Sequence, residues 1–188
     1  MKTVRYFTTT SWSIYDSWSE LLAGTRLLLD ILEKQKYNKI VYINLLRLTL
    51  VSSSQMTEVM LFTQLKKCVN FHSEATKKLF KYDLKKRISF NEARNKWPEI
   101  LTGKNLDFSS EPMQSMKSLS NYRNAAIHHT AKCPMIDIGE SAFYTAIESS
   151  KYLYNHFNEG RWDSSEYKKF VNDNQAKIKT LLRKALDE

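Results

Sequence analysis

Apolar residues along the chain recur at steps of three and four residues, which is the spacing of one face of an α-helix. One such stretch covers residues 14–34, and a longer one covers residues 39–70. Shorter stretches predict helices at about 73–82, 89–101, 110–129, 140–158 and 164–186. In the long second stretch the predicted buried stripe is Val41, Leu45, Leu48, Val51, Met60, Leu61 and Leu65. Five to six of these helices are expected to surround one core.

Local signals mark where some of these helices begin. Ser89 is followed three residues later by Glu92, the capping-box pattern in which the two residues satisfy each other's backbone N–H groups. Pro112 lies near the start of the stretch at 110–129, where a helix tolerates proline. Gly24 lies inside the first stretch, where glycine costs about 1 kcal/mol relative to alanine. We therefore expect a tight contact between helices at Gly24.

Composition favours the same fold class. The 188 residues include only 4 Gly and 3 Pro, too few turn formers for a β-sandwich or barrel. Residues 1–13 are rich in Ser and Thr and show no period, so they are expected to form a poorly ordered start or a short packed arm. Because no long linker divides the rest, residues 14–188 are expected to form an all-α, single-domain helical bundle with a long second helix.

Charge, cysteines and hydropathy narrow the classes of function. The net charge of +9 favours an anionic partner such as nucleic acid, although many basic proteins bind none. Cys68 and Cys133 lack CxxC spacing and are expected to be reduced. The four His residues form no metal-ligand pattern, so we expect no metal and no cofactor. We expect a cytoplasmic protein, because the start lacks a signal-peptide core and Asn44 and Arg47 interrupt the most apolar stretch.

The segment with the clearest chemistry is 120–129, at the end of a predicted helix. Asn124 and His128 are four residues apart and therefore lie on one helix face. Arg123 and His128 are five apart, an angular gap of about 140°, so a second copy of the helix would improve their geometry. Arg offers phosphate a charged, bidentate fork, and His can transfer a proton near neutral pH. These residues form a candidate phosphate site.

Arg123-Asn124-x-x-x-His128 resembles the signature of HEPN domains, the higher eukaryotes and prokaryotes nucleotide-binding domains. In a chain of this composition, the motif with Asn is expected by chance roughly 0.01 times. The resemblance implies a metal-independent endoribonuclease that dimerises so that two motifs share one cleft. It also implies a toxin or an effector of phage defence, with an antitoxin or regulatory partner. Thr130 stands where one branch of the family has the Tyr at which a partner nucleotidyltransferase silences the enzyme, so that control is in doubt here.

The resemblance also implies roles for the individual residues. His128 would transfer the proton as the RNA 2′-OH attacks the adjacent phosphate, leaving 2′,3′-cyclic phosphate ends. Arg123 would stabilise the charged transition state, and Asn124 would orient His128 or a phosphate oxygen. Glu58, on the long second helix, is a candidate partner of Arg123, and His129 is a candidate second imidazole. The alternatives are that Glu58 faces solvent and that His129 is one more cation at a helix end.

A basic run is a candidate path for RNA. Lys85, Lys86 and Arg87 lie near aromatic residues that can stack on bases, and the alternative is a solvated charged face. For Arg123 and His128 the alternative is two cations that favour a helix C-terminus. The rival functions are a non-catalytic helical module that binds RNA or a nucleotide, and a protein-interaction module.

Overall fold

The computed structural model of the chain describes residues 17–34, 38–69, 72–85, 89–127, 136–159, 162–163 and 165. All the regular structure in these residues is α-helical. The helices are α1 (Ser17–Lys34), α2 (Lys39–Val69), α3 (Glu74–Lys85), α4 (Phe90–Thr102), α5 (Met113–Ile127) and α6 (Ile136–Asn158). The prediction of an all-α bundle with a long second helix is confirmed.

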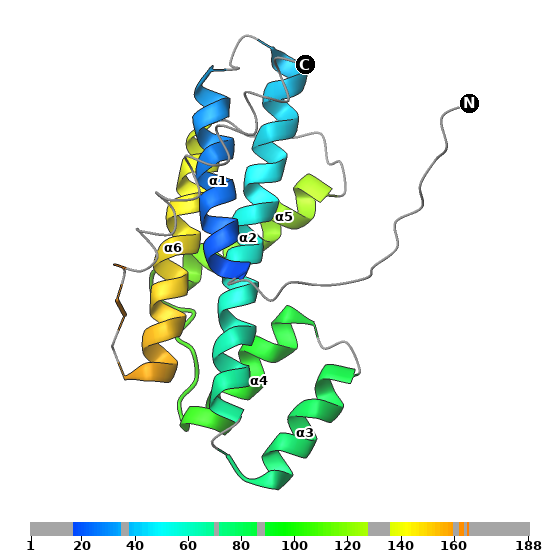
Figure 1. Cartoon of the computed structure of the whole chain (residues 1–188), viewed down its shortest axis with the longest axis vertical. Helices are drawn as coiled ribbons and strands as arrows, with labels where there is room; N and C mark the ends of the chain where they lie inside the picture. Colours follow the sequence, from blue (N-terminus) through cyan, green and yellow to red (C-terminus); the bar gives the residue numbers. More distant parts are fainter. Residues whose placement is uncertain are drawn as a thin grey trace, which may run out of the picture.

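Helix α2 is the central element of the bundle. Its 31 residues extend about 46 Å at the α-helical rise, and it packs against each of the other five helices. Figure 1 shows α1 alongside the upper part of α2, α6 alongside most of its length, α5 crossing near its middle, and α4 and α3 at its lower end. Among the described helices, α3 packs only on α2.

The core lies where α2, α4, α5 and α6 meet. Trp97 of α4 and Leu153 of α6 are fully buried there. The other large buried side chains of this region are Met56, Leu61, Leu65, Met113 and Met116. On the other side of the core the indole N–H of Trp18 donates to Ser150 Oγ over 2.9 Å, which joins α1 to α6.

The predicted start of α4 is confirmed in atomic detail. The Glu92 backbone N–H donates to Ser89 Oγ over 3.2 Å, and the Ser89 backbone N–H donates to Glu92 Oε2 over 3.0 Å. These two bonds satisfy backbone donors that the first turn of a helix cannot pair internally. At the other end Gly103 has a φ of 71°, and its N–H donates to the Glu99 carbonyl. Glycine adopts this left-handed conformation without the cost that a side chain would add.

The predicted buried stripe of α2 is wrong in its first half. Val41 is 38% exposed and Leu48 is 53% exposed, whereas Leu46 and Leu50 are buried. The first half of α2 has apolar residues all around the helix, so spacing alone does not define one buried face. The face is chosen by α1 and α6, which pack against the side that carries Leu46 and Leu50.

The close approach predicted at Gly24 is also wrong, and it occurs at Gly139 instead. A Cβ atom added at Gly24 would meet no atom of the described residues within 4 Å. A Cβ atom at Gly139 would lie 2.7 Å from Leu46 Cδ1 and 3.5 Å from Leu29 Cδ2. Gly139 lies inside α6, because this helix begins at Ile136 and not near residue 140 as the sequence predicted. The absence of a side chain at this position lets α6 approach α1 and α2 closely.

Several sequence predictions fall on residues outside the described part of the chain. They are the arm at 1–13, the first residues of the helix predicted at 14–34, most of the helix predicted at 164–186, Cys133, Thr130, and the site candidates Lys86, Arg87, His128 and His129.

Candidate active site around Arg123 and Glu58

Arg123 continues the buried face of α5. Met116, Leu119 and Arg123 follow one another at steps of three and four residues, and the first two are buried in the core. Arg123 is the third residue of this row, so its side chain is directed toward α2, against which α5 packs. The half-buried state of Arg123 agrees with this direction, since a solvated arginine on the outer face would be exposed.

Glu58 of α2 lies within the electrostatic reach of Arg123. The side chain is half-buried, and burial raises the pKa of the Glu58 carboxyl, while the Arg123 charge lowers it. Burial is the larger of the two effects. No direct ion pair joins the two groups in the described residues, so the attraction acts across a gap. The structure thus brings together two residues from α2 and α5 that the sequence proposed as partners.

Asn124 holds one end of the Arg123 guanidinium. The Nη1–H group donates to Asn124 Oδ1 over 3.0 Å. The Nε–H group is buried and has no hydrogen-bond partner among the described residues. A buried donor without an acceptor costs free energy, and guanidinium N–H groups match phosphate and carboxylate oxygens. The arrangement therefore leaves Arg123 with unused hydrogen-bonding capacity toward an anion.

The histidines of the motif follow directly after this site. Helix α5 ends at Ile127, four residues after Arg123, and the next residues, His128 and His129, lie outside the described part. Lys85 is the last residue of α3, and the positions of its side chain and of Lys86 and Arg87 are likewise outside it. Of the predicted site residues, the described structure brings together Glu58, Arg123 and Asn124.

A second half-buried arginine, Arg94, is not among the residues predicted from the sequence. The Arg94 guanidinium carbon lies 4.9 Å from the Phe108 ring centroid and 5.7 Å from that of Phe90. Its Nε and Nη1 atoms are buried and have no hydrogen-bond partner within the described part of the chain, and burial lowers the pKa of Arg94. The two rings offset part of the lost hydration through cation–π attraction. Phe90 and Arg94 are four residues apart on α4, a visible signal, but Phe108 comes from the following loop.

The described residues contain no group of three or more His, Cys, Asp or Glu side chains that could hold a metal ion. None of the helices in that same part of the chain has the length and hydropathy needed to cross a bilayer. The free thiol at Cys68 is half-buried, and burial raises the pKa of that thiol. A thiol with a raised pKa is a weak nucleophile at neutral pH, which agrees with the expectation that Cys68 is a reduced apolar filler.

No known protein family, curated protein sequence or solved structure matches the chain. The resemblance to HEPN domains remains a hypothesis, which rests on the motif at Arg123 and on the all-α architecture.

Proposed function

We propose that the chain is a metal-independent endoribonuclease whose active site is built on Arg123, Asn124 and His128. The observation that carries the proposal is the Arg123 guanidinium. It lies half-buried on the core-facing row of α5, is held by Asn124, and has a buried N–H group without a partner in the described residues. Such a group can donate to a phosphate oxygen and stabilise extra negative charge on it.

The proposed reaction is an internal transfer within RNA. The ribose 2′-oxygen attacks the adjacent phosphorus while His128 accepts the 2′-OH proton, and the bond from phosphorus to the 5′-oxygen breaks. The departing 5′-oxygen takes a proton from a second imidazole. The products are a 2′,3′-cyclic phosphate and a 5′-OH end. Arg123 stabilises the charge that builds on the equatorial phosphate oxygens, where a fixed guanidinium acts most strongly.

Glu58 has a positioning role in this proposal. A carboxylate of α2 that attracts Arg123 without a direct ion pair biases the guanidinium toward α2. Because no ion pair saturates the guanidinium, its donors stay available for phosphate.

The second imidazole is proposed to come from a second copy of the chain. Arg123 and His128 are five positions apart in the sequence, which on a continued helix corresponds to an angular gap of about 140°, so one copy is not expected to bring the two side chains side by side. Exposed apolar side chains lie beside Arg123 and within the motif, since Tyr122 is 53% exposed and Ile127 is 41% exposed. Apolar residues at such a position suit a dimer in which two α5 ends meet at one cleft.

The biological role in this proposal is that of a toxin or an antiviral defence effector restrained by a partner. This part rests on the resemblance to HEPN domains. It implies that expression of the wild-type chain without its partner arrests growth, whereas the His128→Ala chain does not.

The test is cleavage of total RNA by the purified chain in excess EDTA, with chemical identification of the new 3′ ends. Wild type is expected to leave 2′,3′-cyclic phosphates. Arg123→Ala and His128→Ala should each lower the rate by about 10²–10³-fold, the usual cost of losing a transition-state donor or a proton-transfer group. Arg123→Lys keeps the charge but loses the fork, and His72→Ala is the matched control for a histidine outside the motif.

Cleavage that requires a divalent metal, or that leaves a 3′-OH, would contradict the proposed chemistry. Equal rates for wild type and His128→Ala would remove the motif from the active site. Tight, salt-dependent RNA binding by a chain that never cleaves RNA would favour the rival, a non-catalytic binding module.

A further inference from the structure

Most of the net positive charge of the chain falls in one stretch of the sequence. Residues 66–104 contain 11 Lys and Arg and 4 Asp and Glu, a net charge of +7 out of the +9 of the whole chain. The stretch covers the end of α2, all of α3 and all of α4, which lie together at the lower end of the molecule (Figure 1). Positive charge also predominates in space at this end, where the described charged side chains are Lys66, Lys67, Lys77, Lys78, Arg94, Lys96 and Lys104 against Glu74, Glu92 and Glu99.

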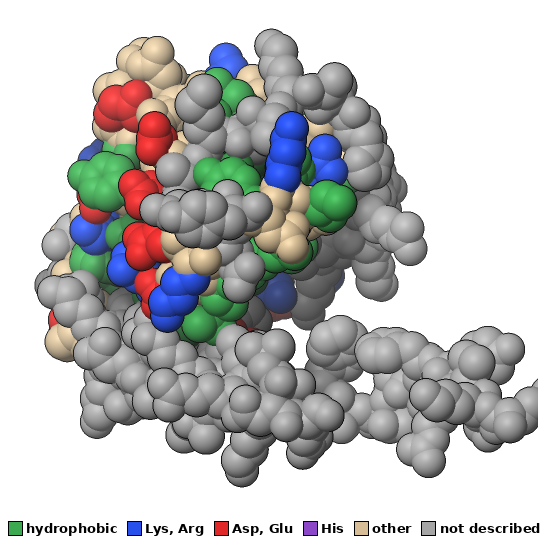
Figure 2. All heavy atoms as spheres, turned by 90° about the horizontal axis from the view of Figure 1, so that it is seen from above, with side chains coloured by type: hydrophobic (Ala, Val, Ile, Leu, Met, Phe, Trp, Pro, Cys, Tyr) green, Lys and Arg blue, Asp and Glu red, His purple; other side chains and the backbone are tan. Residues whose placement is uncertain are grey.

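The opposite end of the molecule carries charges of both signs, since Lys34 and Lys39 are exposed there together with several acidic side chains. Glu33 near the end of α1 and Asp137 and Glu140 at the start of α6 are all exposed. Figure 2, which looks onto that end, shows Asp and Glu side chains gathered on one side of it. A polyanion that approaches the protein is thus attracted more strongly to the lower end than to the upper end.

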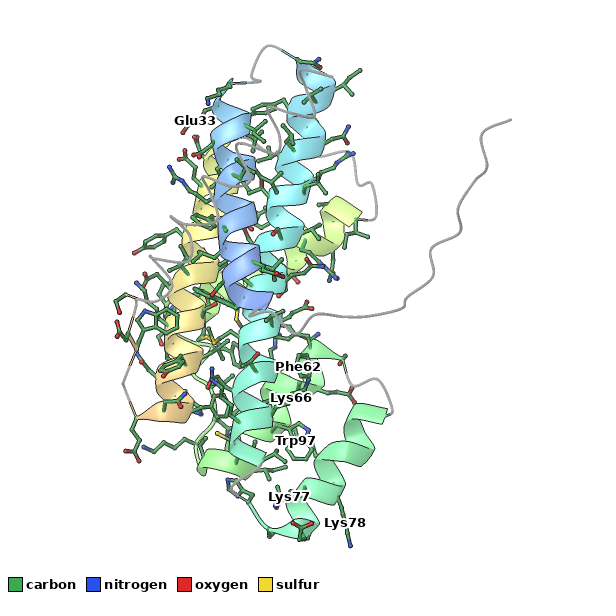
Figure 3. All side chains as sticks on the ribbon, in the orientation of Figure 1. Glu33, Phe62, Lys66, Lys77, Lys78 and Trp97 are labelled. Atoms are coloured by element: carbon green, nitrogen blue, oxygen red, sulfur yellow. The ribbon has the colours of Figure 1, made fainter. Side chains whose placement is uncertain are left out.

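Exposed lysines of three helices form the basic end. Lys66 of α2, Lys78 of α3 and Lys96 of α4 are exposed, and Lys96 Nζ lies 5.8 Å from the ring centroid of Trp97. Figure 3 shows Lys66 on the side of α2 that faces α3 and α4, with Trp97 below it and Lys77 and Lys78 on α3.

The acidic side chains of this region are partly occupied by local bonds. Glu74 accepts from Lys77 Nζ over 2.8 Å, and Glu92 accepts from the Ser89 N–H in the capping box. Neither Lys66 nor Lys78 has an ion pair among the described residues. Their charges are therefore available to an external anion.

One row of α2 connects this end to the Arg123 site. Glu58, Phe62 and Lys66 follow one another at steps of four residues, so they form a ridge along α2. Glu58 and Lys66 are eight positions apart on the helix, a distance of about 12 Å along the axis. Figure 3 shows Phe62 directly above Lys66, and its half-buried ring lies between the two charged positions. The ridge thus joins a guanidinium site to a basic end across only two helical turns.

We propose that the basic face, defined as Lys66, Lys77, Lys78 and Lys96, binds the sugar–phosphate backbone of single-stranded RNA and directs the strand along the α2 ridge to Arg123. The chemistry of the surface is the reason for proposing single-stranded RNA as its partner. Separate lysines on three helices suit successive phosphates of one strand, and a half-buried aromatic ring on the way offers a base a surface on which to stack. The proposal rests on the proposed function in that it takes RNA as the molecule on which Arg123 acts.

The test measures binding of the full chain to a fluorescent, single-stranded 2′-O-methyl oligonucleotide, which cannot be cleaved through its 2′-oxygen. Two double variants that remove the same amount of charge are compared. They are Lys66→Ala with Lys78→Ala on the basic face, and Lys34→Ala with Lys39→Ala at the other end of the molecule. All four lysines are exposed, so the substitutions should leave the fold intact.

The basic-face pair is expected to weaken binding at low salt by about tenfold and to reduce the slope of log affinity against log salt by about 1.4, since two phosphate contacts are lost. The control pair should change affinity by less than about twofold. Equal losses in both pairs, an unchanged affinity for the basic-face pair, or no binding of wild type would overturn the proposal. Binding of phosphatidylserine vesicles but not of the oligonucleotide would also overturn it.

Cleavage of unmodified RNA separates this inference from the proposed function. If wild type cleaves RNA and the basic-face pair cleaves it at the same rate, the basic face is wrong and the active site stands. If the basic-face pair loses binding as expected but wild type cleaves nothing, the binding surface stands and the endoribonuclease is wrong.

Discussion

Glu58 shows how one half-buried side chain links stability to the candidate site. Its carboxyl lies on the central helix between apolar neighbours, and the charge that compensates it is the Arg123 guanidinium of another helix. The pKa of the Glu58 carboxyl is nevertheless raised, because burial has a larger effect on it than the Arg123 charge. The ionised form of Glu58 is therefore held in the folded chain at a cost to stability. Residues kept at such a cost are typical of functional positions.

Replacing Glu58 with Gln tests this cost. A raised carboxyl pKa in the folded state means that wild-type stability falls as pH rises through the range in which Glu58 ionises. Glu58→Gln keeps the shape and removes the charge, so we expect the free energy of unfolding at neutral pH to rise by at most about 1 kcal/mol, a limit that allows for partial solvent screening. Denaturant unfolding at neutral and acidic pH measures the free energy of unfolding of both proteins. The gain in stability of Glu58→Gln over wild type should disappear at acidic pH.

Glu33→Gln is the matched control for Glu58→Gln, because Glu33 is exposed at the end of α1. If Glu58→Gln is less stable than wild type at neutral pH, the attraction between Glu58 and Arg123 outweighs burial, and the carboxylate stabilises the fold.

The helices themselves could largely be predicted from the sequence. The Ser89 and Glu92 capping box fixes the start of α4 through local bonds, and the apolar spacing predicts the length of α2. Arg123 and Glu58 could be proposed as partners because a carboxylate on an apolar helix requires a compensating charge. What the sequence could not provide is tertiary. The exposed face of α2, which includes Leu48, depends on where α1 and α6 pack.

The two helical glycines provide a prediction about packing between elements. Gly24→Ala should raise the free energy of unfolding by about 1 kcal/mol, because alanine favours a helix and nothing lies within 4 Å of the new methyl group. Gly139→Ala has the same helix preference, but its methyl group would lie 2.7 Å from Leu46 Cδ1 in the core. Displacing a fully buried leucine costs about 1–3 kcal/mol, so this variant should be no more stable than wild type.

Urea unfolding of the two alanine variants measures these changes on a common scale. An equal gain for both would mean that α6 does not approach α2 closely at Gly139. A loss of stability for Gly24→Ala would mean that a neighbour does occupy the space beside α1.

For the molecule as a whole, the loop that follows α4 is fastened to α6. Thr102 Oγ1 and His156 Nε2 share a hydrogen bond of 3.1 Å, and the Asp107 N–H donates to the Tyr152 hydroxyl over 3.1 Å. The His156 ring also stacks with Tyr152, at 6.3 Å between centroids. These contacts join α4 and the loop to α6 at the basic end. The integrity of that end therefore depends on a titratable side chain.

The pH dependence of stability tests the fastening. Burial lowers the pKa of His156, and the charge of Lys104 lowers it further. A hydrogen bond to the Lys104 backbone raises the pKa but does not outweigh these effects. Since the folded chain favours the neutral ring, stability is lost as pH falls through the ordinary histidine pKa of about 6.5 toward the lower value in the fold. His156→Gln can still bond Thr102 but does not titrate, so its melting temperature should fall less than that of wild type over this range. His72→Gln changes a histidine outside this contact, so its melting temperature should depend on pH as that of wild type does. If the melting temperatures of wild type and His156→Gln fall in parallel, protonation of His156 does not loosen the contact between the loop and α6.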